Sequence, residues 1–167
     1  MFFPYRDDNP RRHGPPVATL AIIGVCTAVY LLVQLPLGPR DAQAYVLGFG
    51  FIPAVFFGQV ELSGELARVP STATLVTSMF SHGGLMHLVG NMWFLWLYGD
   101  NVEDAMGRFR YLLFYLICGC VGTLAHAALD PASRMPLVGA SGAISGVIAA
   151  YLLIWPRANI RVFYWFF

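Results

Sequence analysis

The sequence predicts an all-α protein that crosses a membrane several times. Of its 167 residues, 57% are hydrophobic and only 11% are charged, whereas soluble domains carry about 25% charged residues. The mean hydropathy is +0.63, and the few charges separate long apolar runs, as in helices that span a bilayer. This composition excludes disorder, and a net charge of +1 gives no basic surface for nucleic acid.

Charged residues divide the chain into apolar segments close to the ~20 residues that a helix needs to cross a bilayer. We predict four complete spans, at residues 17–37, 85–98, 111–129 and 135–156. Residues 1–16 are polar and rich in proline, which predicts a cytoplasmic N-terminal segment. Residues 17–167 are then expected to form a single transmembrane domain.

Two of the apolar segments have alternative interpretations. Residues 42–60 are free of charge but are interrupted by Gly48, Gly50, Pro53 and Gly58. We therefore predict short helices in a partly membrane-embedded loop there. The first span could be a signal peptide cleaved at Ala42-Gln43-Ala44, but its apolar run exceeds the 7–15 residues typical of signal peptides.

Arginine supplies all ten basic residues and indicates an orientation. With a cytoplasmic N-terminus, the inner segments hold Arg6, Arg11, Arg12, Arg108, Arg110, Arg157 and Arg161. The outer segments hold Arg40, Arg68 and Arg134. Because positive charge accumulates in cytoplasmic loops, we expect a multi-pass protein of the bacterial inner membrane with its N-terminus inside.

The sequence ends in an apolar stretch, residues 162–167. As a helix it would extend only about 9 Å at ~1.5 Å per residue, which is too short to cross a bilayer. We therefore expect it to be the start of a fifth span, and the chain to be a fragment of a longer protein. The alternative is a short interfacial anchor.

Polar side chains in two of the predicted spans fall at one depth. His87 and Asn91 are four residues apart, so they share one face of the second span, in its outer half. Ser141 lies a few residues inside the outer end of the fourth span. Because polar groups within a membrane are costly, the three together predict a reactive site.

Each of these features also has a structural interpretation when taken alone. A serine in a membrane helix commonly bonds to a neighbouring carbonyl, and Gly142 and Gly146 are spaced like a close-packing GxxxG surface. His82, His87 and His126 could approach one another as metal ligands. No HExxH motif or intramembrane carboxylate accompanies them, so we expect no metal, and His126 is assigned a structural or interfacial role.

Three stretches carry a family resemblance. Residues 77–92 contain His82, His87 and Asn91, residues 98–107 read YGDNVEDAMG, and residues 139–142 read GASG. In this order and spacing they resemble the second-helix motif, the connection that follows it and the nucleophile motif of the rhomboid intramembrane serine proteases. The resemblance extends over residues 17–167.

This resemblance implies a rhomboid-like six-helix bundle that cleaves transmembrane segments of other proteins at a water-accessible site. Ser141 would be the nucleophile, while His87, Asn91 and the backbone N–H of Ser141 would form the oxyanion hole. Ser145, one turn deeper, is a rival nucleophile whose flanking residues do not match the motif. The expected partners are transmembrane protein substrates and the lipid bilayer, and no cofactor is implied.

The sequence departs from the family pattern in two places. The family's general base is a histidine in its sixth helix, and no histidine of this sequence matches that motif: His13, His82, His87 and His126. This chain by itself is therefore expected to be inactive. A Trp-Arg pair common in the family's first outer loop is also missing from residues 38–70.

Two other functions compete with a serine endopeptidase. An inactive relative could bind transmembrane clients without cutting them, but the joint presence of Ser141, His87 and Asn91 favours the protease. A small transporter or channel would need more polar residues along several spans than this sequence supplies.

Overall fold

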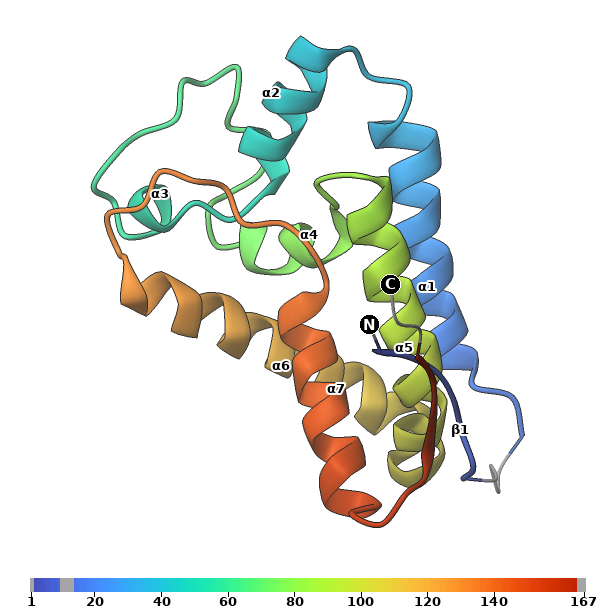
Figure 1. Cartoon of the computed structure of the whole chain (residues 1–167). Coiled ribbons are helices and arrows are strands. Elements are labelled where there is room, and N and C mark those ends of the chain that lie inside the picture. Colours follow the sequence, from blue (N-terminus) through green and yellow to red (C-terminus); the bar gives the residue numbers. More distant parts are fainter. Residues whose placement is uncertain (1, 10–13, 165–167) are drawn as a thin grey trace.

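A computed structural model describes residues 2–9 and 14–164. The elements in chain order are β1 (Phe2–Asp7), α1 (Val17–Ala28), the π-helix η1 (Val29–Gln34), α2 (Pro39–Phe49), α3 (Pro53–Phe56), α4 (Thr74–Phe80), α5 (Leu85–Met106), α6 (Arg108–Leu129), α7 (Ser141–Ile154) and β2 (Ile160–Tyr164). The predicted helical bundle is confirmed as the main architecture (Figure 1).

Each of the four predicted spans contains a long helix. Among the described residues, two helical stretches are long and apolar enough to cross a membrane, α1 continued by η1 and α6. α7 is apolar but shorter, because residues 135–140 form a loop instead of the expected first turns. In that loop, Leu137 pairs with Phe51, each donating its backbone N–H to the other's carbonyl, at 2.7 and 2.9 Å.

The segment expected to contain short helices does contain them. α2 and α3 each begin with a proline, Pro39 and Pro53, whose missing N–H is not needed in the first turn of a helix. Gly50 ends α2 in an extended conformation, where a Cβ atom would meet the backbone carbonyl of Val46. The predicted short helices are therefore confirmed, and they lie at the same end of the bundle as α4 (Figure 1).

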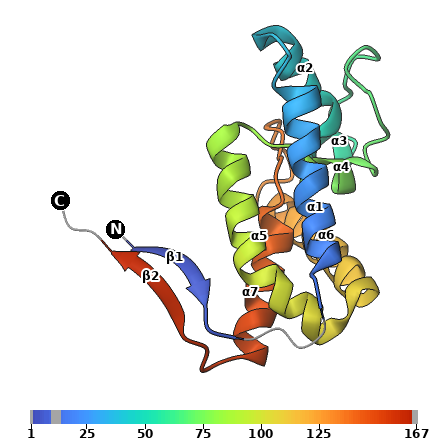
Figure 2. The same cartoon turned by 90° about the vertical axis from the view of Figure 1, so that its right-hand side faces the viewer.

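A two-stranded sheet replaces the predicted start of a fifth span. β1 pairs antiparallel with β2, from Phe2 opposite Tyr164 to Asp7 opposite Ile160, and the pair projects from the helices (Figure 2). The expected helical span is wrong over residues 162–164, and residues 165–167 lie outside the described part. β2 is rich in β-branched and aromatic residues, which favour strands, and β1 supplies its hydrogen-bonding edge.

Polar contacts fix the N-terminal strand to two long helices. The Asp7 carboxylate accepts hydrogen bonds from Asn101 Nδ2 of α5 (2.7 Å) and from the Tyr151 hydroxyl of α7 (2.9 Å). The indole N–H of Trp93 on α5 donates to the Pro4 carbonyl at 2.8 Å. β1 therefore links α5 to α7.

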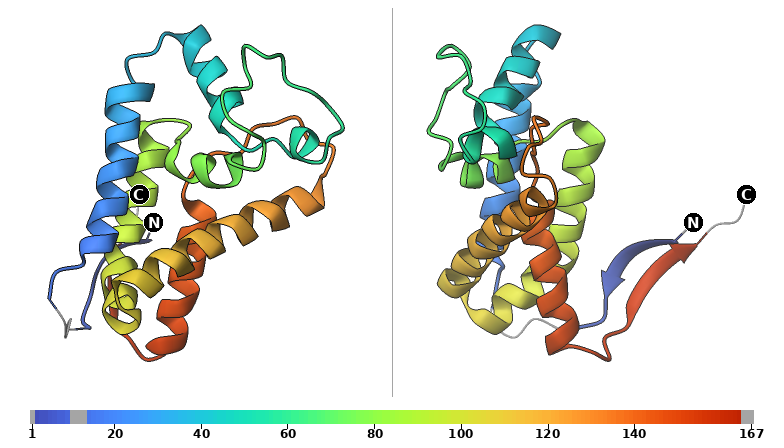
Figure 3. Two further views of the ribbon diagram at one scale, coloured as in Figure 1. Left: turned by 180° about the vertical axis from the view of Figure 1, so that it is seen from behind. Right: turned by 90° about the vertical axis from the view of Figure 1, so that its left-hand side faces the viewer.

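Small residues bring α6 and α7 into close contact where they cross (Figure 3). A Cβ atom on Gly122 would lie 3.0 Å from Gly142 Cα, and one on Gly146 would overlap the Cys118 side chain. The predicted close-packing surface at Gly142 and Gly146 is thus confirmed. It places the start of α7 against α6.

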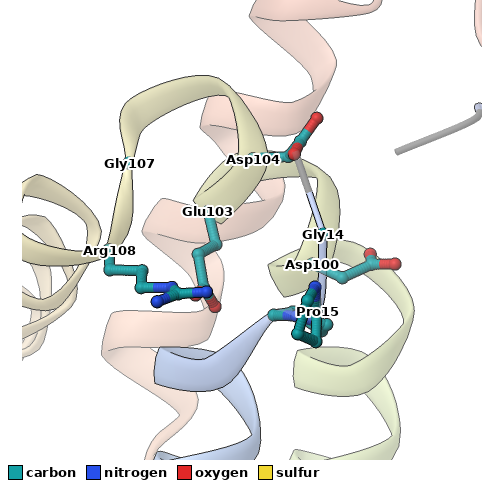
Figure 4. Close-up of a pocket in the computed structure, with 8 residues that line it drawn as sticks. Gly14, Pro15, Asp100, Glu103, Asp104, Gly107 and Arg108 are labelled. Atoms are coloured by element: carbon teal, nitrogen blue, oxygen red, sulfur yellow. The ribbon is translucent and has the colours of Figure 1, made fainter. Parts of the chain in front are cut away.

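A buried carboxylate holds the start of α1 against the end of α5. Glu103, 3% exposed, accepts hydrogen bonds from the backbone N–H groups of Ala18 (2.9 Å) and Thr19 (2.7 Å) and from the Thr19 hydroxyl (2.8 Å). Figure 4 shows Glu103 pointing toward the start of α1 from the wall of a pocket of about 310 Å³. The first N–H groups of a helix have no partner within it, so Glu103 serves as the cap of α1.

Candidate active site

The structure brings together the three residues that the sequence singled out. His87 lies in the first turn of α5, Asn91 one turn later, and Ser141 is the first residue of α7. All three line one pocket of about 340 Å³ between these helices. The expected convergence of the three residues is therefore observed, although their chemical roles remain predictions.

Ser141 is placed where backbone donors are free. The first hydrogen bond at this end of α7 runs from the Ile144 N–H to the Ala140 carbonyl, at 2.9 Å. The N–H groups of residues 141–143 therefore have no acceptor within the helix. They lie at the positive end of the helix dipole, beside the exposed Ser141 side chain.

Gly139 lets the loop before α7 approach the ring of His87. Its φ is +119°, a conformation that side chains disfavour. A Cβ atom at this position would lie 2.7 Å from His87 Cε1 and 2.9 Å from Nε2. The Gly139 N–H donates to the Ser78 carbonyl at 2.8 Å, so α4 holds the loop in place.

One hydrogen bond sets the tautomer of His87. The backbone N–H of Gly83 donates to His87 Nδ1 at 3.3 Å. A ring nitrogen that accepts a hydrogen bond carries no proton, so neutral His87 has its proton on Nε2. Nε2 is the ring nitrogen nearer the position that a Cβ atom of Gly139 would occupy, so the donor is on the side of the ring that faces the loop before α7.

Asn91 is buried and oriented by its own helix. It is 8% exposed, and its Nδ2 donates to the His87 carbonyl at 2.7 Å. An amide nitrogen carries two hydrogens, so this bond uses one of them. Asn91 also lines the pocket that contains Ser141.

The rival nucleophile Ser145 lines the same pocket but is engaged differently. Its hydroxyl donates to the Ser141 carbonyl at 2.8 Å, the back-bonding that serines commonly make within helices. The proton of Ser145 is therefore committed to the helix backbone. This contact favours Ser141 as the reactive hydroxyl.

His82 is buried directly behind His87. It is 1% exposed, its ring contacts the His87 ring edge to face at a centroid distance of 5.4 Å, and neither of its ring nitrogens has a partner among the described residues. Burial lowers the pKa of His82 from 6.5 to about 4, and the proximity of His87 acts in the same direction. His82 is therefore neutral at ordinary pH.

This pKa predicts a specific acid sensitivity. A histidine whose pKa is lowered by folding binds protons more tightly when unfolded, so stability is lost as the pH falls from about 6.5 towards 4. We expect Tm to fall over this range by more in the wild type than in His82→Asn. Thermal unfolding across the pH series measures the difference. An equal fall in both proteins would contradict the prediction, and exposed His126→Asn is the control.

A second pocket at Ser141 was not predicted. Its volume is about 340 Å³, and its polar lining comes from α4, α6 and α7: Ser78, Thr123, His126, Ser141 and Ser145. His126 was expected to have a structural or interfacial role; its place beside Ser141 in this pocket arises only from the way α6 crosses α7. His13 lies outside the described residues.

The histidines do not form a metal centre within the described residues. His82 and His87 are in contact, whereas His126 lines the other pocket. No group of three or more His, Cys, Asp or Glu side chains that could hold a metal occurs within residues 2–9 and 14–164.

The sequence matches a known protein family. The family model described as the Rhomboid domain matches residues 69–167, more than half of the sequence. This chain belongs to the rhomboid family. The matched region contains His87, Asn91 and Ser141, so the pocket between α5 and α7 lies in the rhomboid domain.

Curated relatives of this rhomboid membrane protein include one named a protease and one named inactive. It is 32% identical over 143 residues to rhomboid protease GluP of Bacillus subtilis, covering 86% of this chain and 25% of that protein. It is 29% identical over 147 residues to mitochondrial rhomboid protein 1 of Saccharomyces cerevisiae, covering 86% and 38%. It is 36% identical over 101 residues to inactive rhomboid protein 1 of Drosophila melanogaster, covering 59% and 6%. The chain thus spans well under half the length of these relatives.

Proposed function

We propose that this rhomboid protein is an intramembrane serine endopeptidase that cleaves transmembrane segments of other membrane proteins. The observation that carries the proposal is the shared pocket of Ser141, His87 and Asn91. It joins an exposed hydroxyl to side-chain donors and to the free N–H groups at the start of α7. Similarity to rhomboid protease GluP supports the same reaction.

In the proposed mechanism, Ser141 Oγ attacks the scissile carbonyl of the substrate. As the new Oγ–C bond forms, the π electron pair of the C=O bond moves onto the carbonyl oxygen. The carbon becomes tetrahedral and the oxygen becomes an oxyanion. Donors fixed in advance stabilise that charge without reorganisation. We assign this role to the Ser141 backbone N–H, the Nε2 proton of His87 and the second amide hydrogen of Asn91.

Activation of Ser141 requires a base to take its proton. The rhomboid pattern supplies a histidine from a sixth helix, and no histidine of this sequence matches that motif. We therefore propose the activity for the full-length protein and not for these residues alone. We assign Ser145 no chemical role, since its hydroxyl bonds to the Ser141 carbonyl.

The proposed setting is the bacterial inner membrane. Residues 17–167 would form the transmembrane rhomboid domain, and residues 1–16 would form a cytoplasmic segment. The distribution of arginines supports this orientation. Reporter fusions at the N-terminus and in the loop of residues 57–73 test it, because this orientation requires the N-terminal reporter to lie in the cytoplasm and the loop reporter outside it.

An inactive, client-binding rhomboid is the second candidate function. It is favoured by the 36% identity to inactive rhomboid protein 1. Such a protein would retain transmembrane clients without hydrolysing them.

A fluorophosphonate probe separates the two functions. We expect the full-length wild-type protein to be labelled covalently at Ser141, because the probe reacts only with an activated serine. Labelling should disappear in Ser141→Ala and persist in Ser145→Ala. Absence of wild-type labelling, or labelling that survives Ser141→Ala, would contradict the protease and favour the client-binding function.

A further inference from the structure

A glutamine at the end of the first span contacts the backbone next to the candidate site. Gln34 ends η1, and both ends of its side-chain amide are used. Its Nε2 donates to the His82 carbonyl at 2.8 Å, and its Oε1 accepts from the His82 N–H at 3.0 Å. This pair of bonds fixes both peptide groups of His82 across 48 positions of sequence.

The residue after His82 makes the hydrogen bond that orients His87. The peptide group between His82 and Gly83 makes two hydrogen bonds. Its carbonyl, on His82, accepts from Gln34, and its N–H, on Gly83, donates to His87 Nδ1 at 3.3 Å. A rigid planar peptide thus joins the amide of Gln34 to the ring of His87. The His82 ring also packs against the His87 ring, so the Gln34 bonds reach His87 by two routes.

Gln34 lies at the end of the π-helix η1, where its side chain contacts the backbone of His82. In η1 the Leu35 N–H bonds to the Tyr30 carbonyl, at 2.8 Å, five residues back instead of the usual four. This wider turn changes the direction in which the following side chains leave the helix axis. Leu31, Leu32 and Val33 are exposed, whereas Gln34 is half-buried against the loop before α5. Single π turns inside helices are frequent at functional sites.

We propose that Gln34 is a positioning residue for the oxyanion donor of this enzyme. It holds the His82–Gly83 peptide so that Gly83 keeps Nδ1 of His87 as an acceptor and the proton stays on Nε2. The inference rests on the proposed protease function, in which His87 donates to the oxyanion. It assigns to the first span a role in the chemistry, although that span contributes no residue to the pocket of Ser141, His87 and Asn91.

The consequence of losing Gln34 is a misplaced donor. Without the amide, the His82–Gly83 peptide can rotate, Nδ1 loses its donor, and the proton of His87 divides between the two ring nitrogens. Misplacing a catalytic group by about 1 Å can reduce the rate by on the order of 100-fold. We expect Gln34→Leu and Gln34→Met to lower kcat by about 10- to 100-fold and to change KM by less than about twofold, since the substrate-binding groups stay in place.

The kinetic test is a double-mutant cycle in the full-length protein with a transmembrane substrate. If Gln34 acts through His87, Gln34→Leu should cause no further loss in a His87→Ala background. Gln43→Leu, at an exposed position of α2, is the matched control and should keep wild-type kcat. An unchanged kcat in both Gln34 variants, or an equal loss with and without His87, would overturn the proposal.

A spectroscopic test does not depend on activity. In protein labelled with ¹⁵N-histidine, the His87 signals, assigned by their loss in His87→Ala, should report the Nε2–H tautomer in the wild type. A mixture of tautomers is expected in Gln34→Leu and Gln34→Met, while Gln43→Leu stays unchanged. A single unchanged tautomer in folded Gln34 variants would overturn the proposal. If wild-type cleavage proves independent of Ser141, the proposed function fails, and this spectrum still decides whether Gln34 positions His87.

Discussion

Replacing either His87 or Asn91 with alanine is expected to lower kcat for a transmembrane substrate by about 10²–10³-fold, as for the loss of one oxyanion-hole donor in a known serine protease. Both side chains line the pocket that contains Ser141, and each carries a hydrogen to which we assign the stabilisation of the developing oxyanion. Because this charge exists only in the transition state, KM should change far less than kcat.

Two features of the structure sharpen this test. Asn91 lies one turn after His87 in α5 and donates to the His87 carbonyl. Because the two residues act together, the fall in kcat of the double variant should be smaller than the product of the two single falls. Val89 lies on the same turn, is 49% exposed and does not line the pocket, so Val89→Ala is the control. Wild-type kcat in both single variants would remove His87 and Asn91 from the proposed mechanism.

Replacing Glu103 with alanine is expected to lower the free energy of unfolding by about 3–5 kcal/mol, because three donors lose their acceptor and each unsatisfied buried group costs about 1–3 kcal/mol. The side chain is 3% exposed, and its carboxylate accepts from three donors at the start of α1. Hydrogen bonds to charged groups contribute about 1.5–3 kcal/mol each. Loss of these hydrogen bonds leaves the backbone N–H groups of Ala18 and Thr19 and the Thr19 hydroxyl buried without an acceptor.

Reversible unfolding in mixed micelles measures the effect. Glu103→Gln keeps one acceptor oxygen and loses the charge, so it should cost less than Glu103→Ala. Glu65→Ala, at an exposed position before α4, should stay within about 0.5 kcal/mol of the wild type. A loss of less than 1 kcal/mol in Glu103→Ala would show that Glu103 contributes little to holding α1 against α5.

The convergence of the candidate site was predictable from local spacing and topology. A separation of four residues puts His87 and Asn91 on one face of a helix whatever surrounds it. Alternation of spans puts the start of the second span and the start of the fourth on one side, which brings Ser141 to the same depth. These arguments need only helical periodicity and the number of crossings between the motifs.

Features that depend on pairing between distant segments were not predictable in this way. The strand at residues 160–164 forms against β1 at the other end of the chain, and an apolar stretch of this length fits a helix equally well from sequence alone. The start of α7 at Ser141 follows from the pairing of Phe51 with Leu137. The bonds from Gln34 to His82 and from Glu103 to Thr19 likewise arise only when the helices pack.

The contacts of Asp7 determine when the N-terminal strand can dock during translation. Asp7 leaves the ribosome among the first residues, yet Tyr151 follows 144 positions later. At about 5–20 residues per second, translation separates the two by roughly 7–30 s, whereas a strand pair can form within about 1–10 μs. The amino-terminal strand must therefore stay unpaired until α7 and β2 have been synthesised, so it docks only after the helices that receive it.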